Sequence, residues 1–410
     1  MGTKNYSSYS DLITFSRAST GTYLDSDGVL KSATTNTPRV EYDYQGNRLG
    51  LLVEEARTNL FNYSNNPLLV DGGGVNSTTI GANTQADPAG TSTASLITAT
   101  TVGGFFGPRY VSGAIGAVYT AWFIVKNSNS TRSRIYVRNS GDAADVTLNW
   151  SGATLSSTTD TLGASTVESL GGDYYKVAVT YTATEVIQRA RFYPDNLDGN
   201  KSVILYAWQL EQGTFPTSYI PTAGATATRS ADVASIGVGA FGYNKTAGSV
   251  LVEATYNADP TLSSYIVEFS DGTAQNNHFL FCNGSPITAR VTTSGTLEAN
   301  LQVTGATPVS QGHNFKASYA LSEDNFNLAI DGSLAAGDTS VSVPTVNNLF
   351  VGSRLGSGYM FTGHISSIAY YPRRLTDAQI KALTSPPETP TLSLAFDDSS
   401  TSYLETSIHG

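Results

Sequence analysis

Residues 173–182 have the sequence DYYKVAVTYT, and this stretch decides the fold class. β-Branched and aromatic side chains dominate it, and polar residues alternate with apolar ones, which is typical of a β-strand with one buried face. Residues 249–256 (SVLVEATY) and 326–331 (FNLAID) follow the same pattern, and turn residues bound each run. The sequence therefore predicts an all-β protein.

Asp-Gly pairs fall where such strands need tight turns. Asp27-Gly28 separates TYL from VLK, and Asp331-Gly332 separates NLAI from SLA. An Asp-Gly pair can adopt the positive φ angles of a two-residue primed turn, so each pair indicates a β-hairpin.

One short helix is expected over residues 376–384. Thr376 and Gln379 have the spacing of a capping box, in which each side chain binds the other residue's backbone N–H. A Pro-Pro pair follows and ends the helix. Ile380 and Leu383 are then expected to pack against a sheet edge.

The composition favours a large β-rich protein and argues against a nucleic-acid partner. A chain of 410 residues suggests two or three domains of about 100–200 residues each. Charged residues make up only 14%, and the many small polar residues and 39 Gly suit strands and turns better than long surface helices. The net charge is −10 and Lys and Arg form no cluster, so we expect no DNA or RNA ligand.

The sequence predicts neither a cofactor nor a membrane span. Cys282 is the only cysteine, so no intrachain disulfide can form, and its apolar neighbours indicate a buried thiol. The four histidines are too far apart for a zinc site: His278, His313, His364 and His409. A structural calcium ion in a sandwich loop stays open, because Asp side chains and backbone carbonyls are available. The N-terminus lacks the apolar segment of a secretion signal, and no apolar run reaches the roughly 18 residues of a membrane helix.

The strand-like runs divide the chain into four parts. Residues 1–65 are expected to form a small N-terminal attachment region, and residues 66–222 a first β-sandwich. Residues 223–390 are expected to form a second β-sandwich that ends in the capped helix. Residues 391–410 form a tail with one more strand-like run, which could add to a neighbouring sheet or subunit. The predicted architecture is thus two β-sandwiches in tandem.

Three segments near the N-terminus resemble a module of phage tail, tail-fibre and head-fibre proteins. They have the order and spacing of that family: ITFSRASTGTYLD (13–25), PRVEY (38–42) and GLLVEEARTNL (50–60). Three later segments resemble the end of a carbohydrate-binding-module-like jelly roll in the same proteins: WQLEQG (208–213), PTSYIPT (216–222) and TRSAD (228–232).

The second predicted sandwich is similar to concanavalin A-like domains of the laminin-G type. The similarity lies in four segments: LAIDG (328–332), LFVG (349–352), GHISSIAYY (363–371) and RLTDAQI (374–380). In that family such segments are the penultimate strands and the closing helix. Together, the resemblances touch most of the chain after residue 11.

These resemblances imply a structural protein of a tailed-phage virion, in a fibre, in the tail or as head decoration. Residues 1–65 would anchor it to other virion proteins, and the jelly-roll sandwiches would act as spacers or display glycan-binding sites for host attachment. The resemblance also implies a homo-oligomer and localisation in the virion after assembly in the host cytoplasm. A dedicated host-receptor lectin is an alternative.

A polysaccharide depolymerase is a second alternative, for which the sequence offers no catalytic pair. Glycosidases place two carboxylates across a sugar-binding groove. Glu268 and Asp271 are three residues apart, so they are expected on opposite faces of a strand, and Glu253 stands alone. We therefore expect no enzymatic activity.

Glycan binding needs exposed aromatic faces and well-placed polar groups. Trp150 closes a strand-like run beside a Ser-Gly turn, where it could be exposed, whereas Trp122 and Trp208 are in apolar runs and are expected in the core. Four residues of the second sandwich are in loop-like positions that could converge at one rim: Asp271, Asn283, Arg354 and Tyr359. We predict that these four residues and Trp150 bind glycan.

Overall fold

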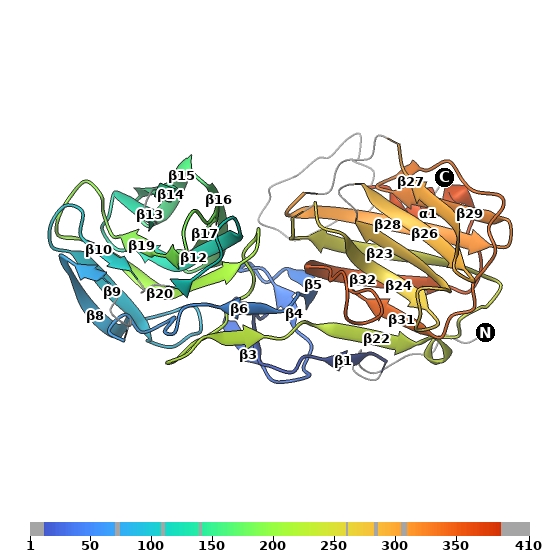
Figure 1. Cartoon of the computed structure of the whole chain (residues 1–410), viewed down its shortest axis with the longest axis horizontal. Helices are drawn as coiled ribbons and strands as arrows, with labels where there is room; N and C mark the ends of the chain where they lie inside the picture. Colours follow the sequence, from blue (N-terminus) through green and yellow to red (C-terminus); the bar gives the residue numbers. More distant parts are fainter. Residues whose placement is uncertain are drawn as a thin grey trace, which may run out of the picture.

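The computed structural model describes residues 12–69, 74–107, 111–138, 142–259, 261–282, 286–304 and 310–386. Within these ranges the chain is all-β, with strands β1 to β32 and the helix α1 (Asp377–Thr384). Two β-sandwiches, called the first and the second sandwich below, form the two lobes in Figure 1. No helix in the described ranges is long and apolar enough to cross a membrane. The strand-like run predicted in the C-terminal tail lies outside the described residues.

The first sandwich consists of two six-stranded antiparallel sheets. One sheet has the order β15 (Thr154–Leu162), β14 (Asp142–Ser151), β13 (Arg132–Arg138), β19 (Ala190–Tyr193), β10 (Phe105–Gly107) and β7 (Gly74–Asn76). The other has the order β16 (Ala164–Gly171), β17 (Tyr174–Thr182), β12 (Val118–Asn127), β20 (Lys201–Gln212), β9 (Ala94–Ala99) and β8 (Thr78–Gln85). The short strands β11 (Val111–Ser112) and β18 (Ile187–Gln188) pair separately.

The stretch 173–182 forms β17, and both faces of this strand are covered, whereas its alternating sequence is typical of one buried face. Val177, Val179 and Tyr181 pack in the core between the two sheets. Tyr174 and Ala178 pack on the outer face in a second apolar cluster. A strand with apolar side chains on both faces is typically covered on both sides.

Trp208 and Trp122 are fully buried on opposite faces of the same sheet, so the prediction that both are in apolar cores is confirmed. Trp208 lies between the sheets and donates its indole N–H to the carbonyl of Tyr63 (2.7 Å). Trp122 lies on the outer face, in a cluster that includes Leu24 from the N-terminal part of the chain. The N-terminal part therefore covers this face of the first sandwich.

The second sandwich consists of two seven-stranded sheets. One has the order β1 (Thr14–Ser16), β22 (Val233–Gly237), β31 (Asn348–Val351), β24 (Ser264–Ser270), β25 (Asn277–Cys282), β26 (Ile287–Thr293) and β27 (Thr296–Gln302). The other has the order β30 (Ser333–Leu334), β29 (Asn325–Ile330), β28 (His313–Ser322), β23 (Ala247–Tyr256), β32 (Gly363–Tyr371), β5 (Arg48–Val53) and β4 (Val40–Tyr42). Cys282 lies in the core between them, as predicted, and burial raises the pKa of its thiol to about 12.

The described part of residues 1–65 contributes to both sandwiches. β1, β4 and β5 belong to the sheets of the second sandwich, where β5 pairs with β32. The hairpin of β2 (Gly21–Leu24) and β3 (Leu30–Ala33) packs on the first sandwich instead. β6 (Arg57–Asn59) pairs with β21 (Ala227–Arg229) between the lobes (Figure 1). Strand pairing thus crosses the boundary predicted at residue 65, and an attachment role for this region stays a prediction.

The predicted turn and helix signals are confirmed. Asp331 and Gly332 have φ angles of 46° and 78°, as a primed turn between β29 and β30 requires. The helix α1 begins with the capping box of Thr376 and Gln379. Ile380 is fully buried against β28 and β29, so α1 covers the outer face of that sheet close to its β30 edge.

Candidate functional site

Three strands of the second sandwich carry aromatic and arginine side chains on their outer face. Along β25 the side chains alternate between the core and the outer face, and β24 has a bulge between Tyr265 and Val267. Tyr265, Phe279 and Phe281 point outward. The ring centroids of Tyr265 and Phe279 are 4.6 Å apart, and those of Phe279 and Phe281 are 5.2 Å apart. On β26, Arg290 is opposite Phe279 in the ladder, with its guanidinium 4.8 Å from the Phe281 ring centroid.

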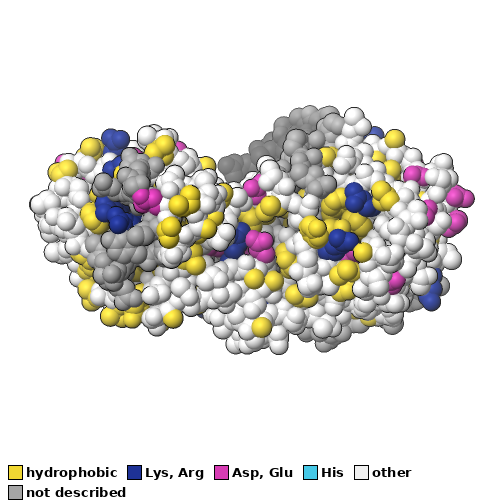
Figure 2. All heavy atoms as spheres, viewed as in Figure 1, with side chains coloured by type: hydrophobic (Ala, Val, Ile, Leu, Met, Phe, Trp, Pro, Cys, Tyr) yellow, Lys and Arg dark blue, Asp and Glu magenta, His cyan; other side chains and the backbone are white. Residues whose placement is uncertain are grey.

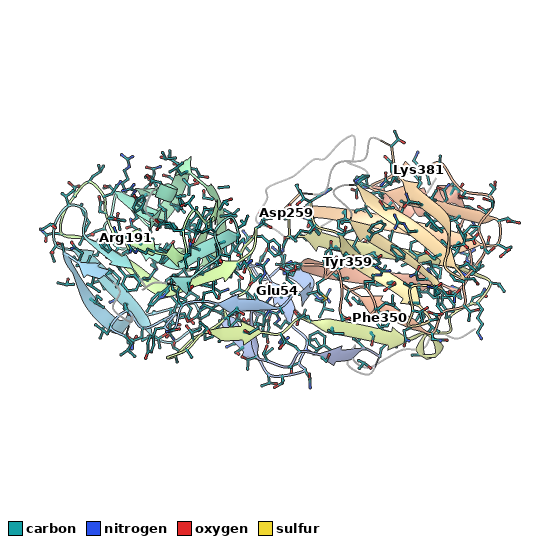
Figure 3. The ribbon with its side chains drawn as sticks, viewed as in Figure 1. Glu54, Arg191, Asp259, Phe350, Tyr359 and Lys381 are labelled. Atoms are coloured by element: carbon teal, nitrogen blue, oxygen red, sulfur yellow. The ribbon has the colours of Figure 1, made fainter. Side chains whose placement is uncertain are left out.

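The loop between β31 and β32 adds Arg354 and Tyr359 to this surface. The backbone N–H of Tyr265 donates to the carbonyl of Tyr359 (2.8 Å), which ties the loop to β24. The Arg354 guanidinium lies 5.6 Å from the ring centroids of both tyrosines. Tyr359 is 53% exposed, whereas the rings of the stack below are buried. Figure 3 labels Tyr359 on this lobe, and Figure 2 shows Lys or Arg side chains among hydrophobic ones there.

We call this surface the aromatic–arginine face. Its members are Tyr265, Phe279, Phe281, Arg290, Arg354 and Tyr359.

The loop holds Tyr359 in a backbone conformation that L-residues rarely adopt. The φ angles of Tyr359 and Leu355 are 46° and 49°, in the left-handed region. For a bulky residue this conformation costs about 1–3 kcal/mol and persists only where surrounding contacts hold it. The backbone N–H of Arg354 supplies one such contact, because it donates to the carbonyl of Gly358 (2.7 Å). Strain of this kind is concentrated at ligand sites, and here it accompanies the exposed ring.

Glu268 lies on the outer face of the same sheet. Its side chain is buried, and its carboxylate accepts the backbone N–H of Leu355 (2.6 Å) and the side-chain amide of Asn277 (3.3 Å). Burial raises the pKa of Glu268 to about 7, although the hydrogen bond from Leu355 and the charge of Arg354 act to lower it. Close to neutral pH, a substantial fraction of the molecules therefore carries an uncharged Glu268.

The aromatic–arginine face can hold a sugar ring. An exposed tyrosine ring offers a flat apolar surface to sugar C–H groups, and a guanidinium presents up to five N–H donors in one plane. The buried rings hold both guanidiniums by cation–π contacts. The two arginine side chains therefore lose less conformational entropy when a ligand binds. Such a surface suits a polar ligand that has one apolar side.

The structure brings together two of the five predicted glycan-binding residues, Arg354 and Tyr359. Asp271 follows the end of β24 that is away from Tyr265, about 20 Å from Tyr265 at ~3.3 Å per residue. Its carboxylate accepts both the backbone N–H (2.8 Å) and the hydroxyl (2.6 Å) of Thr273, so it stabilises the turn after β24. The prediction that Asp271 converges with the other two is therefore wrong. Asn283 lies outside the described residues.

Trp150 is part of the core of the first sandwich, so the prediction of an exposed Trp150 is wrong. It is 8% exposed, and its indole N–H donates to the hydroxyl of Ser133 (2.8 Å). Its ring packs edge-on against Tyr175, with the centroids 6.0 Å apart. The physical reason is the strand period: Val146 and Leu148 face the core, and Trp150 continues that alternation along β14.

The base of the candidate site was not predicted from the sequence: Tyr265, Phe279, Phe281 and Arg290. The run HFLFC of β25 looks like a core strand, and half of it is one, because Leu280 and Cys282 face the core. Phe279 and Phe281 occupy the alternate positions and face outward. The available signal was an aromatic side chain at every second position of a strand that already had an aliphatic face.

A cavity of about 530 Å³ lies between the two sandwiches. Five titratable side chains line it, and each has a partner: Glu41, Glu54, Glu168, Lys176 and His364. The imidazole of His364 lies 2.7 Å from Glu41, and the ammonium of Lys176 lies 3.4 Å from Glu168. Because the titratable groups that line it already have partners, this cavity is a weaker candidate than the aromatic–arginine face.

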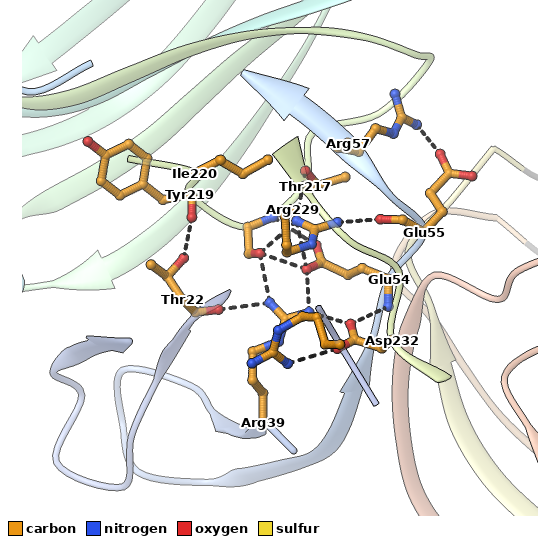
Figure 4. Close-up of polar contacts among 12 residues, drawn as sticks. Thr22, Arg39, Glu54, Glu55, Arg57, Thr217, Tyr219, Ile220, Arg229 and Asp232 are labelled. Carbon is orange, nitrogen blue, oxygen red and sulfur yellow. Dashed lines mark hydrogen bonds and ion pairs between the residues drawn. The ribbon is translucent and has the colours of Figure 1, made fainter. Parts of the chain in front are cut away.

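A buried polar cluster joins the two sandwiches, and we call its five residues the junction cluster (Figure 4). Asp232 pairs with Arg17 (2.9 Å) and Arg39. Glu54 pairs with Arg39 (2.8 Å) and Arg229 (3.1 Å). All five side chains are at least 96% buried. They come from four of the six phage-like segments, so these segments, far apart in the sequence, meet at one structural joint.

Glu54 is the centre of the junction cluster. Burial acts to raise its pKa, but the charges of Arg229 and Arg39 and two hydrogen bonds from Ser218 outweigh burial, so the pKa of Glu54 lies well below its ordinary value. A charged Glu54 is therefore part of the folded structure. Removing it would leave Arg229 buried without a carboxylate partner, which is costly.

The carboxylates considered for catalysis are used in other contacts. Glu253 on β23 forms an ion pair with Lys316 of the neighbouring strand (3.0 Å). Glu268 accepts hydrogen bonds under the loop that carries Tyr359, and Asp271 stabilises a turn. Among the residues that the structure describes, no three His, Cys, Asp or Glu side chains come together as metal ligands. The expected lack of enzymatic activity and the open possibility of calcium both stay predictions.

No family model matches the chain, and no curated protein matches it either. Among solved structures, the chain is similar to the CBM40 of the Ruminococcus gnavus IT-sialidase bound to alpha2,3 sialyllactose, with 18% identity and a TM-score of 0.31 over 35% of this chain and 84% of that one. It is also similar to the NanB sialidase of Streptococcus pneumoniae, with 13% identity and a TM-score of 0.31 over 40% of this chain and 28% of that one. The heptameric SAP-like pentraxin of Limulus polyphemus matches with 12% identity and a TM-score of 0.28 over 35% and 73%. Similarity at this level assigns neither a family nor a ligand.

Proposed function

We propose that this protein is a non-enzymatic structural protein of a tailed-phage virion that binds host surface glycans through its aromatic–arginine face. The glycan-binding part rests on one observation. An exposed Tyr359 ring is held by a strained loop beside the Arg354 guanidinium, on a rigid sheet. Binding residues are commonly presented by loops that a rigid scaffold positions.

The virion part of the proposal is supported by the phage-like segments and by their place in the fold. Residues of these segments form the junction cluster, which holds the two sandwiches to each other through buried ion pairs. A chain that serves as a spacer in a particle needs such a rigid joint. Residues 1–65 are proposed to contact other virion proteins, and the protein is proposed to act as a homo-oligomer.

The glycan-binding part is tested with the purified full-length chain on a glycan array. We expect specific binding that is lost in Tyr359→Ala. Tyr44→Ala is the matched control, because Tyr44 is also exposed (44%) and lies in the N-terminal region. Equal binding by wild type and Tyr359→Ala would place the site elsewhere, and no binding to any glycan would overturn this part of the proposal.

Two further measurements test the rest of the proposal. Incubation with bacterial surface polysaccharide should release no reducing ends, and release would make the protein a depolymerase. Mass spectrometry of phage particles purified from a culture that produces the chain should detect its peptides. Their absence from the particles would contradict a structural role in the virion.

A further inference from the structure

Every fully buried arginine among the described residues has a carboxylate partner, whereas several half-buried ones, among them Arg191, Arg290 and Arg354, have none. Carboxylates lie within 4.0 Å of Arg17, Arg39, Arg57, Arg134, Arg229 and Arg374. Among the described residues, no carboxylate lies within that distance of Arg290 or Arg354. A cation that loses water without gaining a partner is unfavourable. The positive charges of the aromatic–arginine face are thus unmatched by the protein itself.

The donors of these two arginines are also mostly unused. The Nε of Arg354 is buried and has no hydrogen-bond partner in the described part of the chain. Arg290 donates its Nε–H to the side-chain carbonyl of Asn300 (3.1 Å), and the structure gives no acceptor for its terminal N–H groups among the described residues. A planar fork of free N–H groups matches the oxygens of a carboxylate, sulfate or phosphate.

Glu268 forms no ion pair with Arg354, although the charge of Arg354 acts to lower the pKa of Glu268. Its oxygens accept hydrogen bonds from Leu355 and Asn277. The whole chain carries a net charge of −10, so it does not attract anions by its overall charge. Any preference for an anion at this face must therefore come from the local arrangement of Arg290 and Arg354.

We propose that the aromatic–arginine face binds acidic saccharides, which carry a carboxylate, sulfate or phosphate group. Arg354 and Arg290 bind the acidic group, and the ring of Tyr359 stacks on the apolar side of the sugar. This inference rests on the glycan-binding function proposed above and adds the chemical class of the ligand.

The test compares matched pairs of glycans on the full-length chain. Each immobilised acidic polysaccharide is placed beside its neutral form: a polyuronate with its carboxyl-reduced form, a sulfated galactan with its desulfated form, and a phosphorylated mannan with its dephosphorylated form. We expect at least one acidic member to bind ~10-fold or more tightly than its neutral form. Arg354→Met and Arg290→Met should each remove most of that difference.

Arg191→Met is the matched control, because Arg191 also lies over an aromatic ring but belongs to the first sandwich. It should leave binding unchanged. Arg354→Lys keeps the charge but loses the planar fork, so it should retain part of the preference, and circular dichroism checks that each variant is folded.

The outcomes separate the two proposals. Equal binding of acidic and neutral forms, unaffected by the Arg290 and Arg354 variants, would overturn the acidic class and leave glycan binding standing. A preference for acidic forms that only Arg191→Met removes would place it on the first sandwich and overturn the inference. No binding to any member, together with a blank glycan array, would overturn both.

Discussion

On the first sandwich, Arg134 and Arg191 lie over aromatic rings, as Arg290 and Arg354 do on the second. The guanidinium of Arg134 is 4.4 Å from the Tyr136 ring centroid, and that of Arg191 is 4.3 Å from the Phe105 centroid. Both groups lie on the outer face of a sheet, opposite the core. Judged by ring contacts alone, the two faces are equivalent.

The two faces differ in ring exposure and in the pairing of one arginine, because Arg134 has a carboxylate partner whereas Arg191, like Arg290 and Arg354, has none among the described residues. Asp145 accepts two hydrogen bonds from Arg134 (2.7 and 2.6 Å), and this pairing raises the pKa of Arg134. Tyr136 and Tyr193 are each 8% exposed, whereas Tyr359 on the second sandwich is 53% exposed. An arginine on a ring stack is thus a common structural element. It becomes a binding candidate when its charge has no partner and an exposed ring lies next to it.

The largest effect on the free energy of unfolding is expected in the junction cluster, whose buried arginines all have carboxylate partners. Glu54→Gln removes a carboxylate that pairs with Arg39 and Arg229 and should lower the free energy of unfolding by about 3–5 kcal/mol. Chemical denaturation measures the change. Glu253→Gln is the control, because its pair with Lys316 is about one-third exposed and should cost less than about 1 kcal/mol. Equal costs would show that the buried ion pairs of the junction cluster stabilise the fold no more than a partly exposed pair does.

Glu268→Gln tests whether the Glu268 carboxylate forms an ion pair with Arg354. Because folding raises the pKa of Glu268 from its unfolded value to about 7, the folded state binds the extra proton, and stability falls as the pH rises from about 4.5 to 7. Gln mimics the protonated form. The variant should therefore match the wild type below pH 4.5 and be more stable above pH 7, by up to about 3 kcal/mol. A variant that is less stable than the wild type at pH 8 would show that Glu268 pairs with Arg354, as Asp145 does with Arg134.

A smaller loss of stability is expected for Asp145→Asn on the first sandwich. The change keeps the size of the side chain but leaves the half-buried Arg134 without its bidentate partner. We expect unfolding to become easier by about 1–2 kcal/mol, measured by thermal denaturation. No change would mean that the ion pair of the first face is dispensable, and the contrast between the two faces would weaken.

The smallest effect on stability is expected for Arg354→Met. Arg354 has no ion pair to lose among the described residues, and the flexible Met side chain can still pack between Tyr265 and Tyr359. The expected cost is less than about 1 kcal/mol, the contribution of a cation–π contact. A thermal shift larger than that of Asp145→Asn would make Arg354 a structural residue and remove the reason to regard it as a ligand group.

Local sequence signals were sufficient to predict the turns and the helix, but they were not sufficient to predict the whole aromatic–arginine face. The turn at Asp331-Gly332 and the capping box of Thr376 are set by residues within four positions of each other, so they can be predicted from the sequence alone. Arg354 and Tyr359 were predicted to converge because both have loop-like positions in the sequence, and the structure places them together.

The remainder of the site depends on which strands become neighbours. Phe279 and Arg290 are a cross-strand pair, and Tyr265 joins them from a third strand. The junction cluster shows the same limit: Arg17 and Asp232 belong to recognisable segments, but 215 positions separate them, and their ion pair exists only in the folded sandwich. Period-two patterns show that a side chain alternates, and they do not show which face will be buried.

The pairing of β5 with β32 also sets an order of events for the growing chain. Glu41 and His364, which hydrogen-bond in the same sheet, are 323 positions apart. A ribosome adds about 5–20 residues per second, so β4 and β5 wait on the order of 15–60 s for their partner strand. The first sandwich can complete its sheets during that delay, because its strands lie between the two parts of the second. Closing the second sandwich is then the last step of folding, and contacts of such high sequence separation make that step slow.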